Sequence, residues 1–299
     1  AVCCLSSVNL EEYDEWKDNP QFINDLVRML DNVITHFCDA APAQLYRAVA
    51  SAKAERSIGL GAMGFHAYLQ RHNIPFESAM AKSRNNKMFS FIKGEAENAT
   101  RELAVERGPC PDGASAGVRN AHLLAVAPNA SSSIICGNTS PSIEPYRANA
   151  FTQKTKSGSS LLKNEYLEHA LQEIGQDTDD VWKSIITNGG SVQHLEFLDD
   201  YTKDVFKTAV EIDQRWVIEM AADRQEKICQ SQSLNIFFPS NVSKQELHAI
   251  HMMAWKKKVK TLYYLRSEAL KRAETVSDEV LRQYIFDSID DEGCLACEG

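Results

Sequence analysis

Apolar residues recur at helical spacing in the first third of the chain. The recurring positions are Phe22, Leu26, Met29 and Val33. Side chains three and four residues apart share one face of a helix, so this pattern predicts helical structure between residues 11 and 49, with these positions on its apolar side. A second long helix with polar faces is predicted over residues 84–107.

Short apolar runs alternate with helical patterns along the rest of the chain. Strands are predicted at 1–10, 123–127, 234–238 and 259–265, and further helices at 160–189, 198–227 and 243–255. Ser243 precedes Glu246 by three residues, which is the capping-box pattern of a helix start. Strands that alternate with helices are typical of βα units, so the sequence predicts an α/β fold with a mainly parallel sheet or barrel.

The loops and the C-terminal end have distinctive compositions. A long segment rich in Ser, Asn, Thr and Pro covers residues 128–146, and loops of this length between ordered elements are usually functional. No internal repeat or low-complexity linker divides the chain, so residues 1–286 are expected to form one domain. Residues 287–299 are acidic and flanked by glycine, which predicts a mobile tail.

Charge and cysteine content exclude several classes of protein. The chain has 299 residues, with 32 Lys+Arg against 41 Asp+Glu and a formal net charge of -9, which disfavours nucleic acid as a partner. No apolar run reaches the roughly 18 residues of a membrane span, and the N-terminus lacks the layout of a secretory signal. Eight scattered cysteines do not resemble a disulfide framework. We therefore expect a soluble, cytoplasmic protein with reduced thiols and no membrane partner.

Two segments could carry chemistry. Residues 128–133 are Pro128, Asn129, Ala130, Ser131, Ser132 and Ser133. Backbone N–H groups beside serine hydroxyls can bind an anion, although the same composition also suits a simple turn or helix cap. Tyr263 and Tyr264 are adjacent phenols that could relay a radical. Regular strand alternation would point them to opposite faces, and two buried aromatic strand residues are the alternative.

The cysteines offer a third candidate chemistry. Cys294 and Cys297 have the spacing of an exchange dithiol and also of half a zinc site, and an incidental pair is the remaining alternative. Because no second such pair or close His/Cys cluster exists, no metal site is expected. Cys3 lies on the first predicted strand beside Cys4, where a small core residue is the alternative to a redox function.

Five segments, in this order, resemble the large subunit of aerobic class I ribonucleotide reductases. They are AVCCLSSVNL (1–10), RSIGLGAMGF (56–65), PNASSSIICGNTSPSIEP (128–145), QSQSLNIF (230–237) and KTLYY (260–264). The resemblance implies the C-terminal half of that family's ten-stranded α/β barrel, followed by a redox-active tail. It departs from the family at Asn129, where threonine is frequent, and in the close spacing of the tail cysteines.

The resemblance also implies residue roles. Cys3 matches one of the two cysteines that reduce the substrate, and residues 128–133 match the loop for the substrate diphosphate. A radical would reach Tyr264 and pass to Tyr263. Cys294 and Cys297 would reduce the active-site disulfide and be restored by thioredoxin or glutaredoxin. The remaining cysteines are expected to be structural: Cys4, Cys38, Cys110, Cys136 and Cys229.

Partners follow from the same resemblance. The substrate would be a ribonucleoside diphosphate, and the metal or radical cofactor would reside in a separate small subunit, with none bound by this chain. The family's radical-bearing cysteine, its second reducing cysteine and its ATP or dNTP effector sites precede Cys3. We therefore expect a complementary N-terminal polypeptide, from a split gene or from processing.

Two other functions remain compatible with the sequence. One is a noncatalytic binding or scaffold protein derived from the reductase, which would keep the fold without the reaction. The other is a diverged cobalamin-dependent reductase. The adjacent Tyr263 and Tyr264 argue against the latter, because a radical generated on bound cobalamin needs no relay from another subunit.

Overall fold

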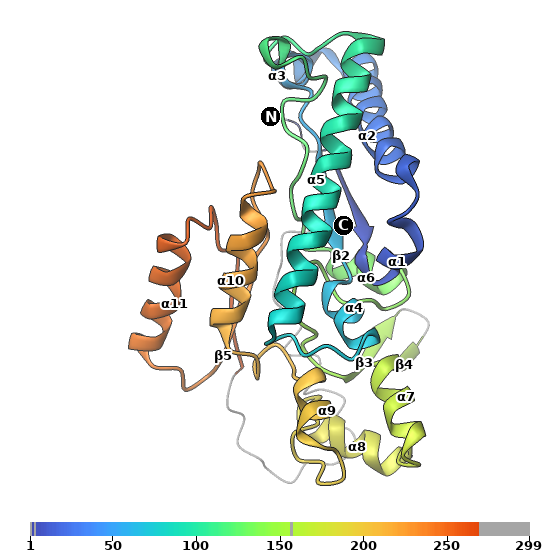
Figure 1. Ribbon diagram of the computed structural model, residues 1–299, viewed down its shortest axis with the longest axis vertical. Helices are drawn as coiled ribbons and strands as arrows, with labels where there is room; N and C mark the ends of the chain where they lie inside the picture. Colours follow the sequence, from blue (N-terminus) through green and yellow to red (C-terminus); the bar gives the residue numbers. More distant parts are fainter. Residues whose placement is uncertain (1, 3, 156–157, 269–299) are drawn as a thin grey trace.

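The computed structural model describes residues 2, 4–155 and 158–268, and Figure 1 shows their arrangement. The helices are α1 (Tyr13–Trp16), α2 (Pro20–Ala40), α3 (Tyr46–Glu55), α4 (Phe65–Arg71), α5 (Ala79–Arg107), α6 (Ala130–Ile135), α7 (Glu165–Glu173), α8 (Asp179–Thr187), α9 (Asp200–Val205), α10 (Gln214–Gln225) and α11 (Lys244–Lys256). The strands are β1 (Leu5–Asn9), β2 (Gly59–Met63), β3 (Ala150–Thr155), β4 (Gly158–Lys163), β5 (Ile236–Pro239) and β6 (Leu265–Glu268). Short 3-10 helices are η1 (Leu10–Glu12), η2 (Ala43–Leu45) and η3 (Ala114–Ala116).

Parallel pairing runs through the part of the fold that holds the candidate residues. Strand β1 pairs in parallel with β2, and β5 pairs in parallel with β6. Between these pairs, isolated parallel bridges join Leu60 to Leu124 and Val126 to Gln232. This arrangement confirms the predicted α/β class and its mainly parallel strands. The predicted strand at 123–127 forms only bridges, and the predicted strand at 259–265 is replaced by one that begins at Leu265.

Two glycines let the chain segments around β2 approach one another. A Cβ atom on Gly61 would lie 2.4 Å from the carbonyl oxygen of Ala125, so only glycine allows this backbone contact. Gly64 has a φ of 80°, and a Cβ there would lie 2.2 Å from Asn9 Oδ1. Gly64 therefore lets the chain turn from β2 into α4 in close contact with Asn9, the last residue of β1.

The main core confirms that α2 is helical but places its buried face differently. The fully buried apolar residues of α2 are Ile23, Val27, Leu30 and Ile34. Met29 and Val33, predicted to lie on the apolar side, are each 45% exposed. Two apolar stripes overlap on this helix, and the stripe that packs against α5 (Figure 1) is the one removed from water.

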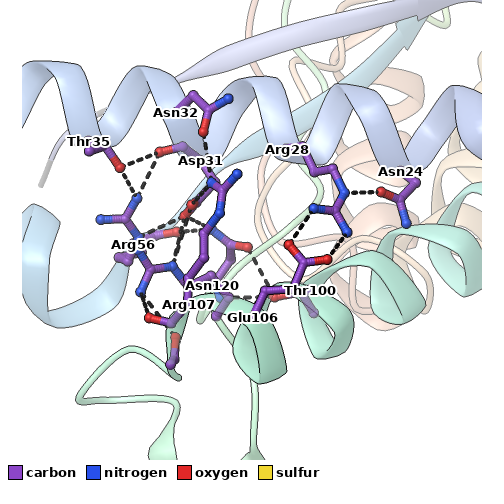
Figure 2. Close-up of polar contacts among 12 residues, drawn as sticks. Asn24, Arg28, Asp31, Asn32, Thr35, Arg56, Thr100, Glu106, Arg107 and Asn120 are labelled. Carbon is purple, nitrogen blue, oxygen red and sulfur yellow. Dashed lines mark hydrogen bonds and ion pairs between the residues drawn. The ribbon is translucent and has the colours of Figure 1, made fainter.

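A buried carboxylate joins four separate segments beside this core (Figure 2). Asp31 on α2 is fully buried, and its Oδ1 lies 2.7 Å from Arg56 Nε at the end of α3. Arg107 and Arg119 lie 3.0 and 3.3 Å from the same carboxylate, and Asn120 donates to it at 3.2 Å. Burial raises the pKa of Asp31, but its bonds to the three guanidinium groups outweigh burial and hold the pKa below its usual value.

A smaller second core lies at one end of the molecule, where α7, α8 and α9 gather beside the β3–β4 hairpin (Figure 1). This antiparallel hairpin was not expected from the sequence, which predicted helix from residue 160. Asn164, which caps α7, donates to Gln70 Oε1 at 2.7 Å and so connects the two parts of the fold. None of the described helices is long and apolar enough to cross a membrane.

Candidate active site

The serine loop, residues 128–133, contains the start of the short helix α6, which follows a residue with a strained backbone. Asn129 adopts a left-handed conformation with a φ of 55°, and α6 begins directly after it. The first backbone bond into Asn129 O comes from Ser133 N at 3.0 Å. The N–H groups of residues 130–132 precede that bond, so this turn retains backbone donors.

The three serines of the loop are not equivalent. Ser131 is exposed and Ser132 is half-buried, so both hydroxyls are within reach of a ligand. Ser133 is buried, and its hydroxyl donates to Ala130 O at 3.1 Å within the turn. We therefore expect Ser133 to shape the loop and Ser131 and Ser132 to face a bound group.

Asn129 itself is directed away from the helix that it precedes. It is 5% exposed and makes no side-chain capping bond to α6. Its Oδ1 instead accepts a hydrogen bond from Ser7 Oγ at 3.1 Å, across 122 positions of sequence. Ser7 lies on β1, four positions after Cys3 in the sequence, so the loop is tied to the strand that follows that cysteine.

The two phenols lie together rather than on opposite faces. The ring centroids of Tyr263 and Tyr264 are 4.1 Å apart with an interplanar angle of 46°, and the hydroxyl oxygens are 3.3 Å apart. Tyr263 is 39% exposed and Tyr264 is half-buried. Because β6 begins only at Leu265, strand alternation does not separate the rings. This supplies the local departure from strand geometry that a relay requires.

A buried carboxyl group that the sequence did not single out lies behind this pair. Asn235 Oδ1 accepts from Tyr264 N at 3.0 Å, and Asn235 N donates to Glu144 Oε1 at 3.2 Å. Burial raises the pKa of Glu144 to about 7, against the opposing charges of Arg147 and Arg266. The guanidinium of Arg266 also lies 4.8 Å from the ring centroid of Tyr264. The lone acidic residue between Ile143 and Pro145 was the available sequence signal for this site.

Glu144 should make the stability of the chain depend on pH. Its pKa rises from 4.5 to about 7 on folding, so its contribution to stability is full below pH 4.5 and is lost as the pH rises toward 7. We expect the Glu144→Gln variant, whose Oε1 still accepts from Asn235, to avoid this loss of about 3 kcal/mol. Urea unfolding at pH 4.5 and pH 8 measures it, with Glu196→Gln as the exposed control. Equal pH dependence in wild type and E144Q would contradict the assignment.

A second buried carboxyl lies where β1 ends. Glu11 is 7% exposed and accepts a hydrogen bond from the Tyr166 hydroxyl. Asn9 Oδ1 accepts from Glu11 N at 3.1 Å and from the hydroxyl of Thr139 at 3.4 Å, which ties the segment after α6 to the same strand end. Burial raises the pKa of Glu11 despite these hydrogen bonds.

The thiols are only partly described. Cys3, Cys294 and Cys297 lie outside the described residues, so their predicted roles stay predictions. Of the other cysteines, Cys4 and Cys110 are buried, Cys38 is intermediate, and Cys136 and Cys229 are exposed. Within residues 2, 4–155 and 158–268, no group of three His, Cys, Asp or Glu side chains could hold a metal ion.

Comparisons with known proteins agree on one family. A family model described as "Ribonucleotide reductase, barrel domain" matches residues 1–113 and 111–265. The chain is 52% identical over 281 residues to the ribonucleoside-diphosphate reductase large subunit of Invertebrate iridescent virus 6, covering 93% of this chain and 29% of that protein. It is 45% identical to the corresponding subunit of Invertebrate iridescent virus 3, covering all of this chain and 48% of that protein.

A solved structure gives the same result in three dimensions. The chain superimposes on the Actinobacillus ureae class Id ribonucleotide reductase alpha subunit with a TM-score of 0.84 and 40% sequence identity, covering 90% of this chain and 50% of that one. It thus spans about half or less of the length of these relatives. The family match covers nearly all described residues, including the serine loop and both tyrosines. The chain belongs to the ribonucleotide reductase barrel-domain family.

Proposed function

We propose that the chain supplies the C-terminal half of the catalytic barrel of a ribonucleoside-diphosphate reductase large subunit. The reaction would be the radical reduction of a ribonucleoside diphosphate to the deoxyribonucleotide in the cytoplasm. The observation that carries this proposal is the pair of adjacent phenols, whose hydroxyl oxygens are 3.3 Å apart. Family membership alone gives the fold, whereas this pair gives a path for an oxidising equivalent.

The relay step needs only the two hydroxyls. A radical on Tyr264 takes one electron and one proton from the Tyr263 hydroxyl, which restores Tyr264 and leaves the radical on Tyr263. The Tyr263 hydroxyl donates to the Tyr264 hydroxyl at 3.3 Å, and this hydrogen bond joins the two oxygens between which the proton would move. The half-buried Tyr264 would receive its oxidising equivalent from a small subunit that carries the metal or radical cofactor. Tyr263 would pass it to a cysteine in the N-terminal half of the barrel.

The serine loop would bind the phosphate end of the substrate. The N–H groups of residues 130–132 and the hydroxyls of Ser131 and Ser132 are donors of the kind that phosphate oxygens accept. Pro128 and Asn129 set the entry to this turn, and Ser133 stabilises it from inside. We propose that Cys3 supplies one reducing thiol, and that Cys294 and Cys297 renew it by disulfide exchange with thioredoxin or glutaredoxin.

Reconstitution tests this function. The chain would be combined with an N-terminal half from a related large subunit, supplied as a separate polypeptide, and with a radical-generating small subunit, cytidine diphosphate and a dithiol reductant. We expect deoxycytidine diphosphate to form, with none formed when either half or the small subunit is omitted.

Two controls sharpen the result. A full-length large subunit in which the two halves are fused reports whether the separate chains limit activity. If the fused subunit binds its partners but forms no deoxynucleotide, the chain is a scaffold derived from a reductase and the proposed reaction is wrong. If the fused subunit forms product with the small subunit but the two separate halves do not, the split-chain arrangement is refuted and the proposed reaction still stands.

A further inference from the structure

A long-range hydrogen bond connects the serine loop to β1, the strand that follows Cys3 in the sequence. Asn129 sits at the position where asparagine normally caps a helix with its own side chain. It makes no such bond, because its Oδ1 accepts from Ser7 Oγ at 3.1 Å. A polar side chain at 5% exposure that gives up the local bond for a distant one fixes the position of its loop.

The surroundings hold both partners in place. Ser7 pairs with Gly61 in the parallel β1–β2 ladder, and a Cβ on Gly61 would approach Ser7 Oγ to 3.3 Å. Gly61 also lies directly against Ala125 O, three residues before Pro128. The strand, its neighbour and the segment that leads into the loop are therefore in contact around this hydrogen bond.

Asn129 combines this contact with a left-handed backbone. A φ of 55° is unfavourable for most side chains, and asparagine is among the few that tolerate it. From that conformation Asn129 O accepts from Ser133 N, which closes the first turn of α6. The side chain is thus held by Ser7 while the backbone closes the first turn of α6.

We propose that Ser7 and Asn129 are positioning residues that fix the serine loop relative to β1. A nucleoside diphosphate bound on the loop would thereby be aligned with the segment that follows Cys3. This inference rests on the proposed function, because it assigns a role to the loop in that reaction. Neither residue is a catalytic residue. Their effect is to keep the loop in its binding-competent form, so their loss weakens binding in proportion to the competent fraction that remains.

Binding and turnover of cytidine diphosphate by the complete large subunit with its small subunit test the inference. In Ser7→Ala the donor is lost. In Asn129→Gly the acceptor is lost, while glycine keeps the left-handed backbone. We expect each variant to raise the KM and the calorimetric Kd for cytidine diphosphate about five- to tenfold, the effect of losing one hydrogen bond, with kcat changed less than twofold. Ser7→Thr, which keeps a hydroxyl, should restore the wild-type KM.

The double variant separates coupling from coincidence. If Ser7 and Asn129 act through their mutual bond, S7A/N129G should be no worse than either single variant. Three results would each overturn the inference and indicate a structural role. They are single-variant effects that multiply in the double variant, an unchanged KM, and a loss of kcat together with a lower unfolding midpoint. Measurable Kd effects in a subunit that reduces no substrate would support the inference while refuting the proposed reaction.

Discussion

Replacing either tyrosine of the pair with phenylalanine should abolish ribonucleotide reduction. In Tyr263→Phe and Tyr264→Phe we expect kcat to fall at least about a thousandfold, which corresponds to about 4 kcal/mol of added barrier. Phenylalanine keeps the ring and its packing but has no hydroxyl from which an electron and a proton can leave together. The two hydroxyls are the only parts of the pair that the substitutions remove, and they lie 3.3 Å apart.

The measurement is the rate of deoxynucleotide formation by the complete large subunit with its small subunit. Tyr46→Phe is the matched control, because Tyr46 is 63% exposed and lies on α3. Substrate Kd and urea unfolding should stay close to wild type in all three variants, since Tyr263 is itself 39% exposed. Full turnover by either relay variant would show that the radical does not use this pair.

The arrangement of the phenols illustrates what sequence could not supply. Regular alternation along a strand puts neighbouring side chains on opposite faces, so the sequence could not show whether the two rings that the resemblance assigns to a relay lie together. The two rings can lie together because Tyr263 N donates to Leu234 O and Ile236 N donates to Tyr264 O, which leaves both tyrosines just ahead of β6. The start of a strand is set by its partner, and β5 lies nearly thirty residues upstream.

The helix predictions failed where packing or strand pairing decides, in the buried face of α2 and in the residues that form β4. Most long helices were anticipated, and Ser243 Oγ accepts from Glu246 N at 3.0 Å, as the capping pattern predicted. In α2, however, the stripe that contains Met29 and the stripe that contains Ile34 both follow helical spacing. Only contact with α5 determines which of them is buried. Periodicity along one chain segment carries no information about that contact.

The β3–β4 hairpin and Glu144 were missed for different reasons. The hairpin segments contain many polar residues and show no clear alternation, so their pairing is not visible in local composition. Glu144 was visible as an acidic residue between apolar neighbours, but its burial depends on Asn235, which is distant in sequence. By contrast, the serine loop was singled out through the resemblance of its ordered residues to the family, and its role in binding phosphate stays a prediction.

The largest effect on stability should come from the carboxylate at the centre of Figure 2. Asp31→Asn is expected to lower the free energy of unfolding by about 3–5 kcal/mol, the usual cost of leaving a buried charge without its partner. Asp31 is fully buried, and among the described residues it is the one carboxylate that forms ion pairs with Arg56, Arg107 and Arg119. An amide of the same shape keeps the packing but leaves their positive charges uncompensated inside the protein.

The substitutions around this carboxylate should rank by burial. Arg56 is 8% exposed and Arg107 is 34% exposed, so we expect Arg56→Gln to cost more than about 2 kcal/mol and Arg107→Gln less than about 1 kcal/mol. Asp25→Asn, on the exposed side of α2, is the control.

Because the pKa of Asp31 is lowered in the folded state, wild type should also lose stability as the pH falls below 3.8, and D31N should lose less. Urea unfolding at pH 7 and pH 3 measures both effects. If D31N unfolded at the same urea concentration as D25N, the cluster would not be what joins α2, α3 and α5.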